Sequence, residues 1–402
     1  LGGSNGRVQQ ASMSCTGAVK PTVVLNPKYL STFQSKFTGV KLAASCQSQA
    51  IDEAICLMTI CSGSLVLRDS RVSLVRDTPL DSLLCVLHES MLEVHNSMFS
   101  DNLASPLFVG NQGSMVLHAS NVSNNAAKGG GGGLWVQDNA SVTITGGSIV
   151  QGNTAGQGGG GLVMLDSARV AVAGASSISN NKAAWCGGGL VAAGNAIITI
   201  TGGSIVQGNT AGEAGGGLVI FDSARVDMAG GSSISNNKAA YGGGGLSAQG
   251  NASATISGGS KVHGNIANQS GGGVAVRDSA EVAVVNSNVH GNIAGWGGGG
   301  VFGELSAKVA VTNSRVQSNT AQLSGGGLSV MDIASLTITG DSIVSKNTAQ
   351  DGGGGVFAQN ASKVTIANST VFANSAGDGG GGLVVINSAS LTITGSIVAN
   401  NT

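Results

Sequence analysis

Charged side chains that could carry out acid–base chemistry are rare in this sequence, since only 10% of its 402 residues are charged. Within the repetitive part of the chain, the one modest concentration is Arg277, Asp278, Glu281 and Glu304. An enzyme that cleaves polysaccharides needs two or three carboxylates, or an arginine or lysine base, converging on one groove. These four residues are therefore the candidates for a polysaccharide lyase or a glycoside hydrolase.

Two further sets of residues have the chemistry of metal ligands. Aspartates recur at one position of a repeat, and carboxylates in register could bind Ca²⁺. They are Asp138, Asp166, Asp222, Asp278 and Asp332. His263 and His290 each follow a valine and precede Gly-Asn, so they occupy equivalent places and could bridge a metal ion.

The cysteines and the sequons point to a secreted protein. Five cysteines lie before residue 86 and predict disulfides of an N-terminal cap, although an odd number leaves one over. They are Cys15, Cys46, Cys56, Cys61 and Cys85. Cys186 is separated in the sequence from the other five cysteines. It could be a buried free thiol or form an intermolecular disulfide. It could also pair with the odd N-terminal cysteine if the cap folds far along the molecule. Asn-x-Ser/Thr sequons occur at Asn400 and at six glycosylation candidates, which are Asn121, Asn139, Asn251, Asn268, Asn360 and Asn368.

The elements that must position these residues follow from a repeat of 27 or 28 residues. One marker is the apolar residue after each glycine run, which steps from Leu134 through Leu162 and Leu190 to Leu383. A second marker is the tripeptide Asn-x-Ala, which keeps the same period over eleven or twelve copies. Two markers with one period exclude chance.

Each copy contains three short runs of strand character. In one copy they are Leu134–Val136, Val142–Ile144 and Ser148–Val150, each bounded by turn-forming residues. Three strands separated by turns form one triangular coil, and stacked coils pair their strands in parallel about 4.8 Å apart. The sequence therefore predicts an all-β fold: a right-handed, three-sided parallel β-helix of about 12 coils. Val142 and Ile144 should point inward and Thr143 outward.

The period also predicts the structural roles of the recurring glycines, asparagines and aspartates. Glycine runs should form a corner where the backbone takes positive φ and coils approach closely. The asparagines should stack as a hydrogen-bonded ladder at a corner, where asparagine also tolerates a left-handed conformation. The ladder residues are Asn125, Asn153, Asn181, Asn209, Asn237, Asn265, Asn292, Asn319, Asn347 and Asn374. Asp166, Asp222 and Asp278 would lie two coils, about 10 Å, apart, so we favour a turn role for them over a metal site. We also favour two solvated histidines, and predict no metal or cofactor.

The chain divides into three parts. Residues 1–64 should form a cysteine-containing cap or the end of a preceding domain, and residues 65–106 degenerate first coils. Residues 107–402 should form the regular β-helix, truncated at its C-terminal end. All four prolines and five of the six cysteines precede residue 107.

The repeat resembles that of the polymorphic outer-membrane proteins, which have a pectin-lyase-like β-helix. Matching stretches are Asn347-Thr-Ala-Gln-Asp-Gly-Gly-Gly-Gly-Val356 and Phe372-Ala-Asn-Ser-Ala376, and the match covers roughly residues 100–402. The alanine of the family's Gly-Gly-Ala-Ile signature is glycine here, and its phenylalanine is usually isoleucine or valine. The resemblance implies a microbial or algal surface protein without catalytic activity.

The leading hypothesis from the sequence is a non-enzymatic structural or adhesive rod at the cell surface, cell wall or a surface appendage, able to assemble into a filament. Near-uniform coils give no single coil distinctive chemistry, and this favours a scaffold over an enzyme. Expected partners are other copies of the chain, other surface proteins or polysaccharide. A net charge of −1 gives no reason to expect nucleic acid, and no apolar run reaches the length of a membrane span.

Two alternatives remain open beside that hypothesis. One is the carbohydrate-active enzyme with the four charged residues, and the other is a carbohydrate-binding module. The rare aromatics Trp185, Tyr241 and Trp296 stand just before glycine runs, where they could stack on sugar rings or pack over a neighbouring corner.

Overall fold

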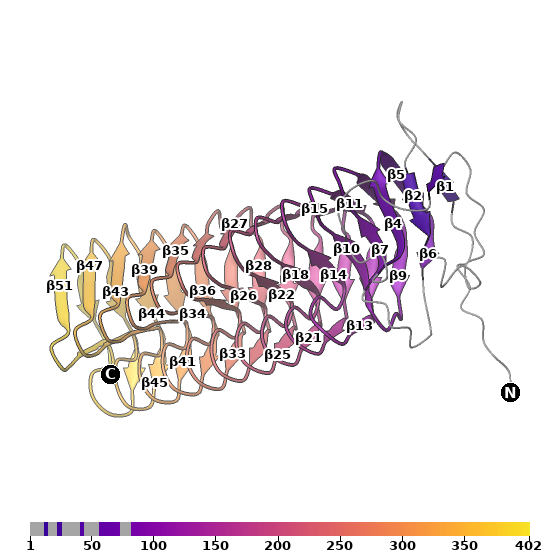
Figure 1. Cartoon of the computed structure of the whole chain (residues 1–402). Coiled ribbons are helices and arrows are strands. Elements are labelled where there is room, and N and C mark those ends of the chain that lie inside the picture. Colours follow the sequence, from indigo (N-terminus) through magenta and orange to yellow (C-terminus); the bar gives the residue numbers. More distant parts are fainter. Residues whose placement is uncertain (1–11, 15–21, 26–40, 44–55, 73–81) are drawn as a thin grey trace, which may run out of the picture.

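The computed structural model describes residues 12–14, 22–25, 41–43, 56–72 and 82–402. Every element in those ranges is a β-strand. One coil consists of β14 (Leu134–Val136), β15 (Ser141–Thr145), β16 (Ile149–Gln151) and β17 (Thr154–Ala155). Each of these strands pairs in parallel with its equivalent in the next coil, so the chain winds into a parallel β-helix (Figure 1). The predicted three-sided fold of about 12 coils is confirmed.

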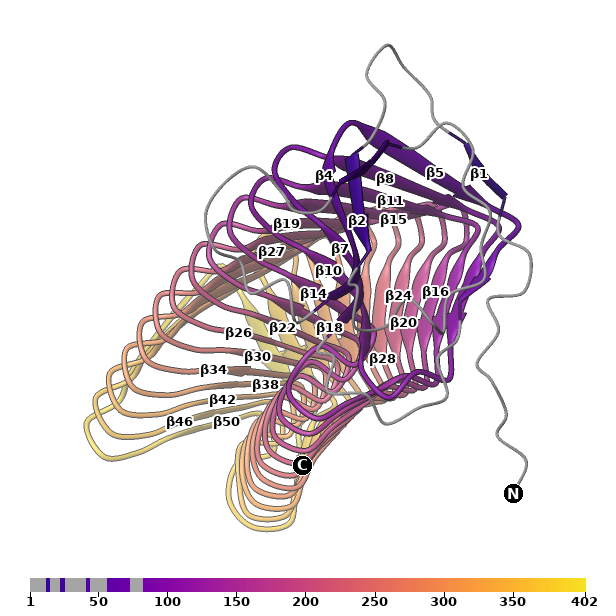
Figure 2. The ribbon, with the colours of Figure 1, turned by 45° about the vertical axis from the view of Figure 1, so that its right-hand side comes forward.

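The strands lie in four sheets, one more than the three runs predicted per repeat. Sheet C contains β14, sheet B contains β15, sheet A contains β16, and a narrow ladder of two-residue strands, sheet D, contains β17. Sheets A, B and C form the three sides of the coil. Figure 2 shows that each coil also projects twice, at the loop joining sheet C to sheet B and at the segment joining sheet D to sheet C.

The core is one continuous apolar cluster that runs the length of the described coils. In the coil of β14 this cluster contains Leu134, Val136, Val142, Ile144 and Val150, all essentially inaccessible to solvent. Thr143, between two buried residues of β15, stays partly exposed, as the alternation predicts. Because β-branched and leucine side chains repeat at the same position, each coil buries its apolar groups against identical ones above and below.

The asparagine row is buried and linked along the axis. The Nδ2 of Asn181 donates to Oδ1 of Asn209 at 3.0 Å and to the carbonyl oxygen of Val150 at 3.0 Å. Its backbone N–H also donates to Oδ1 of Asn209. The same hydrogen bonds recur from Asn102 to Asn401. The expected left-handed conformation lies elsewhere, because the positive φ belongs to the residue before each of these asparagines, such as Asn180 at 53°.

The glycine runs close the outer face of sheet C. A Cβ placed on Gly216 would overlap the carbonyl oxygens of Gly244 and Lys238 in the next coil, and Gly215 has a φ of 64°. The segment therefore lies flat against its neighbours and covers the outward side chains of sheet C. Val163 and Val219 are outward residues that are nevertheless buried for this reason.

Additional strands cover the N-terminal end of the stack. β1 (Ser12–Ser14) pairs antiparallel with β5 (Ser64–Arg68), so it extends sheet B. β2 (Thr22–Leu25) pairs antiparallel with β4 (Cys56–Ser62) and parallel with β3 (Lys41–Ala43), so both extend sheet C. These pairings satisfy backbone groups that an open sheet edge would expose.

Candidate functional site

Four charged side chains gather where sheet C passes into the loop toward sheet B. Arg277 and Asp278 follow β34 (Val274–Val276), Glu304 follows β38 (Val301–Gly303), and Asp332 lies two residues after β42 (Leu328–Val330). Because β34, β38 and β42 pair in register, these residues lie on three successive coils. We call Arg277, Asp278, Glu304 and Asp332 the Arg277–Glu304 site.

The centre of this site is an ion pair that is largely shielded from solvent. Nε of Arg277 lies 2.7 Å from Oε1 of Glu304, and the two side chains are 32% and 27% exposed. Burial raises the pKa of the Glu304 carboxyl, Arg277 opposes that rise, and Asp332 and Asp278 add to it. Glu304 thus combines a fixed cationic neighbour with a greater proton affinity than an exposed glutamate, as acid–base catalysis requires.

The two aspartates of the site are also anchored as turn residues. Oδ2 of Asp278 accepts a hydrogen bond from the backbone N–H of Gly250 at 3.0 Å, and Oδ2 of Asp332 accepts one from Leu305 at 3.2 Å. Their φ values are 59° and 58°. Asp138, Asp166 and Asp222 have equivalent positive φ values and bond the preceding coil in the same way. The aspartates of this row therefore stabilise the turns through these hydrogen bonds.

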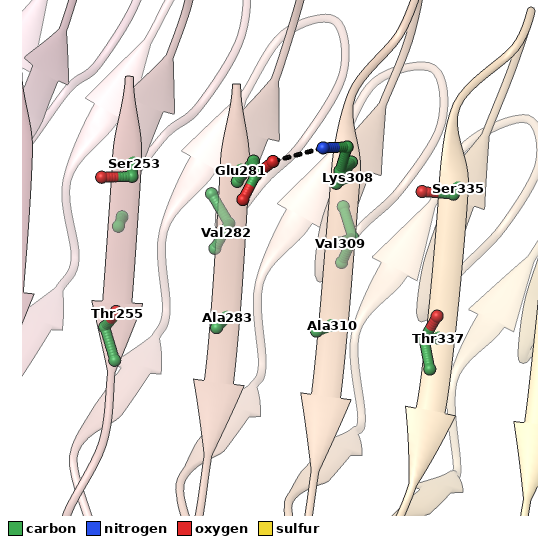
Figure 3. A pocket seen from close by; sticks show the side chains of 11 residues that line it. Ser253, Thr255, Glu281, Val282, Ala283, Lys308, Val309, Ala310, Ser335 and Thr337 are labelled. Carbon is green, nitrogen blue, oxygen red and sulfur yellow. Dashed lines mark hydrogen bonds and ion pairs between the residues drawn. The ribbon is translucent and has the colours of Figure 1, made fainter. Parts of the chain in front are cut away.

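Glu281, grouped with these residues in the sequence, lies apart from them on the outer face of sheet B. It begins β35 (Glu281–Val285) and pairs with Lys308 of β39 (Lys308–Thr312) at 2.5 Å between Nζ and Oε1. Figure 3 shows this pair beside the methyl groups of Ala283 and Ala310. The expectation that Glu281 joins one charged cluster with Arg277 and Glu304 is wrong, since four residues of turn carry the chain to another sheet.

The sheet B pair borders a shallow hollow of about 330 Å³. Its floor includes Ala283 and Ala310, and its ends are the hydroxyl-bearing strands β31 (Ser253–Ile256) and β43 (Ser335–Thr339) (Figure 3). Lys308 and Glu281 are 65% and 56% exposed, so water screens their charges. The hollow can offer hydrogen bonds to a ligand, but its acid and base lack the shielding that Glu304 has.

The two histidines stack on each other on neighbouring coils. His263 ends β32 (Lys261–His263), His290 ends β36 (Asn288–His290), and their parallel rings have centroids 4.9 Å apart. The part of the chain that the structure describes contains no group of three or more potential ligands.

The cysteines split between disulfides and one thiol. Cys56 and Cys85 form a disulfide between β4 and β7 (Ser82–Val86), and Cys61 is also disulfide-bonded. Cys15 and Cys46 lie outside the described residues. Cys186 is a free, partly buried thiol that packs beside Val191, and burial raises its pKa. A disulfide in a domain of this size is typical of oxidising compartments, so the chain is a secreted or cell-envelope protein. None of the described residues forms a helix that could cross a membrane.

The glycosylation candidates differ in accessibility. Four of them are exposed at loops, namely Asn139, Asn251, Asn268 and Asn368. Asn121 and Asn360 are half-buried, and Asn360 donates a hydrogen bond from Nδ2 to Oδ1 of Asp332. Glycosylation of the exposed four stays a prediction.

Known proteins share this architecture. Residues 224–402 match the family model described as the right-handed beta helix region, which confirms the predicted hand. The solved structure of the periplasmic alginate epimerase AlgG aligns with 84% of this chain and 86% of its own, at 11% identity and a TM-score of 0.55. A double mutant of AlgG aligns over the same shares at 10% identity, with a TM-score of 0.34. No curated protein matches the sequence.

These comparisons correct the functional expectation. A non-enzymatic structural or adhesive rod was predicted because uniform coils seemed to argue against catalysis. That premise is wrong, since the solved protein that shares the fold over most of both chains is an enzyme. Both the structural-rod hypothesis and the expectation that the chain is no enzyme are therefore withdrawn in favour of the carbohydrate-active alternative.

Proposed function

We propose that this right-handed β-helix is a carbohydrate-active enzyme that acts on a uronic-acid polysaccharide at the Arg277–Glu304 site. The observation that carries the proposal is the shielded ion pair, in which a carboxyl of raised pKa lies against a guanidinium. Alginate epimerase AlgG, whose solved structure has a similar fold, acts on an anionic polysaccharide. An extracellular or cell-surface location, where such polymers occur, fits the disulfide.

The geometry supports proton abstraction next to a carboxylate. Arg277 would break its ion pair with Glu304 and bind the sugar carboxylate instead, because a guanidinium holds a carboxylate with two parallel hydrogen bonds. The freed Glu304 carboxylate then takes the proton from the carbon bearing that group, and the electron pair of the C–H bond delocalises into the carboxylate held by Arg277. If water then gives a proton to the opposite face of that carbon and Glu304 releases its own proton to water, the sugar is inverted. If instead the electron pair expels the glycosidic oxygen from the neighbouring carbon, that oxygen takes a proton from water or from Glu304, and the chain is cleaved with formation of a C=C bond.

Gly242 leaves room for this exchange. A Cβ built there would lie 3.7 Å from Nη2 of Arg277, so this nitrogen of the guanidinium lies beside a glycine rather than a larger residue. The aspartates at 278 and 332 retain their turn hydrogen bonds throughout. They act on Glu304 through their charge, which keeps its proton affinity high.

The test follows hydrogen exchange and cleavage in one experiment. Alginate, polygalacturonate and a neutral glucan are incubated with the protein in D₂O, and NMR monitors loss of the C5 proton, unsaturated ends and new reducing ends. We expect activity on a polyuronate that falls about 10²- to 10⁴-fold in Glu304→Gln. Glu281→Gln, which also removes an ion-paired carboxylate but on the outer face of sheet B, should stay within about twofold of wild type.

Several outcomes would overturn the proposal. Equal losses in the two glutamine variants would show that Glu304 has no special part. Binding of polyuronates without exchange or cleavage would identify a carbohydrate-binding module instead. Hydrolysis of the neutral glucan alone would replace proton abstraction by glycoside hydrolysis.

A further inference from the structure

Three large aromatic side chains stand exposed at one corner of the coil. Trp185, Tyr241 and Trp296 are 55%, 49% and 53% exposed. Each lies two residues beyond a strand of sheet D, after β21 (Lys182–Ala183), β29 (Lys238–Ala239) and β37 (Ile293–Ala294). The sequence left open whether they bind sugar rings or pack over a neighbouring corner, and about half of each side chain is open to solvent. Aromatic rings left half in water usually serve recognition.

The three rings occur on every second coil. β25 (Thr210–Ala211) separates β21 from β29, and β33 (Ile266–Ala267) separates β29 from β37. With coils about 4.8 Å apart, neighbouring aromatic positions are therefore about 10 Å apart along the axis. The spacing is uniform across both intervals.

Backbone hydrogen bonds fix this spacing. Glu213 donates its N–H to the carbonyl of Trp185 at 2.6 Å, and Tyr241 donates to Glu213 at 2.8 Å. Gln269 donates to Tyr241 at 2.9 Å, and Trp296 donates to Gln269 at 2.8 Å. The corner is thus a rigid column in which aromatic residues alternate with hydrogen-bonding ones, Glu213 and Gln269.

This column borders the Arg277–Glu304 site. Tyr241 directly precedes Gly242, the glycine next to the guanidinium of Arg277. A polymer lying along the column therefore passes the charged pair at its middle aromatic. Trp185 extends the column toward the N-terminal coils and Trp296 toward the C-terminal coils.

We infer that Trp185, Tyr241 and Trp296 form a platform that binds an extended pyranose polysaccharide parallel to the coil axis and presents it to the Arg277–Glu304 site. This inference rests on the proposed function for its substrate. The apolar face of a pyranose ring stacks on an aromatic ring, and in an extended chain the same face recurs at every second sugar. That recurrence matches aromatic rings on alternate coils, while Glu213 and Gln269 hydrogen-bond the hydroxyls of the sugars between them.

A flat protein partner suits this corner less well. Protein interfaces have a continuous apolar centre, whereas the polar residues Glu213 and Gln269 separate the three aromatic residues of the column. The regular spacing of the aromatic residues along the axis instead favours a ligand whose own structure repeats.

The test measures binding rather than turnover, so that it can fail separately from the proposed enzyme activity. Tryptophan fluorescence and calorimetry record the affinity of the full chain for uronate and neutral β-linked oligosaccharides of two, three and five sugars. A trisaccharide spans two aromatics and a pentasaccharide spans three. We expect affinity to rise at least fivefold from three sugars to five, for the uronate series above all.

Single substitutions then locate the platform. Tyr241→Ala should weaken binding of both lengths at least tenfold, since every placement of a trisaccharide uses Tyr241. Trp185→Ala should abolish the gain from three sugars to five. Ile397→Ala, which removes another exposed apolar side chain, 61% exposed at the start of β52 (Ile397–Ala399) in sheet A, is the matched control and should leave all affinities unchanged.

The outcomes separate the two proposals. Length-dependent binding lost in the aromatic variants, without any turnover by wild type, would keep the platform and refute the enzyme. Turnover by wild type with unchanged affinities in Tyr241→Ala and Trp185→Ala would refute the platform and keep the enzyme. Equal weakening by Ile397→Ala would also refute the platform.

Discussion

The asparagine corner and the aromatic corner of the coil have similar backbones and opposite uses. Both are columns in which each coil hydrogen-bonds the next. At the asparagine corner every coil repeats the same residue, which is buried from Asn102 to Asn374. At the aromatic corner, the equivalent residues are Gln157, Trp185, Glu213, Tyr241 and onward, and nearly all are exposed.

The difference teaches where this fold can vary. A buried side chain that completes a hydrogen-bonded row cannot change without leaving a neighbour unsatisfied, so every coil keeps it. An exposed residue on a column held by backbone bonds can change freely. Regularity of the interior therefore says nothing about chemistry outside, and for that reason the uniform repeat misled the functional prediction.

The largest effect should come from filling the close approach between coils. Gly216→Ala should lower the free energy of unfolding by at least about 4 kcal/mol or prevent folding, because the added methyl group meets backbone oxygens that cannot move aside. Gly129→Ala is the matched control, since a Cβ there meets nothing within 4 Å. Urea unfolding of the two variants gives the comparison, and similar losses would show that space between coils is not the constraint.

Removing one member of the asparagine row should cost slightly less. Asn209→Ala deletes hydrogen bonds to Ile178 and Asn237 and leaves Asn181 without its acceptor, at about 3 kcal/mol. Asn195→Ala, at an exposed loop, should cost less than about 0.5 kcal/mol. If the two variants unfold at the same urea concentration, the buried row contributes no more than a surface residue.

The histidine stack should make stability depend on pH. Burial lowers the pKa of His263, as do the charges of His290 and Lys261, and burial and Lys261 lower that of His290. The folded chain thus binds fewer protons than the unfolded chain below the ordinary value of 6.5, so stability is full above that pH and falls as the pH drops. Thermal melting at pH 7.5 and pH 5 should show a smaller difference in the His263→Gln, His290→Gln double variant than in wild type. An equal difference in the two proteins would show that the histidine stack does not contribute to the pH dependence of stability.

The smallest effect should belong to the exposed ion pair of sheet B. Lys308→Gln should change the free energy of unfolding by less than about 0.5 kcal/mol, because both partners are more than half exposed. The same urea assay measures it. A loss as large as that of Asn209→Ala would mean that the outer face is as constrained as the interior.

The repeat predicted most of the fold because the same residue types return every 27 or 28 positions. Strand positions, the inward valines and the buried asparagine row all follow from that period. The fourth strand escaped notice because two residues such as Thr154–Ala155 carry no alternation of their own. A buried serine row, including Ser148 and Ser342, was also missed, since serine is common in turns and gives no distinct signal.

The site was harder to predict than the fold. Arg277 and Glu304 stand one repeat apart, so their pairing could be found from the period alone. The sequence could not show that Glu281 turns away to sheet B, because four residues of loop separate two sheets that the charge pattern does not distinguish. Nor could it show that Glu304 is partly buried, since the burial of a residue after a strand depends on the packing of the folded coils.

The most direct test of the central claim is a crystal structure of the Glu304→Gln variant with a uronate pentasaccharide. That claim is that the exposed outer columns carry the function. The account predicts a sugar chain parallel to the coil axis, with rings on Trp185, Tyr241 and Trp296 and a carboxylate held by Arg277. A pentasaccharide seated in the sheet B hollow beside Lys308, or lying across the coils, would contradict it.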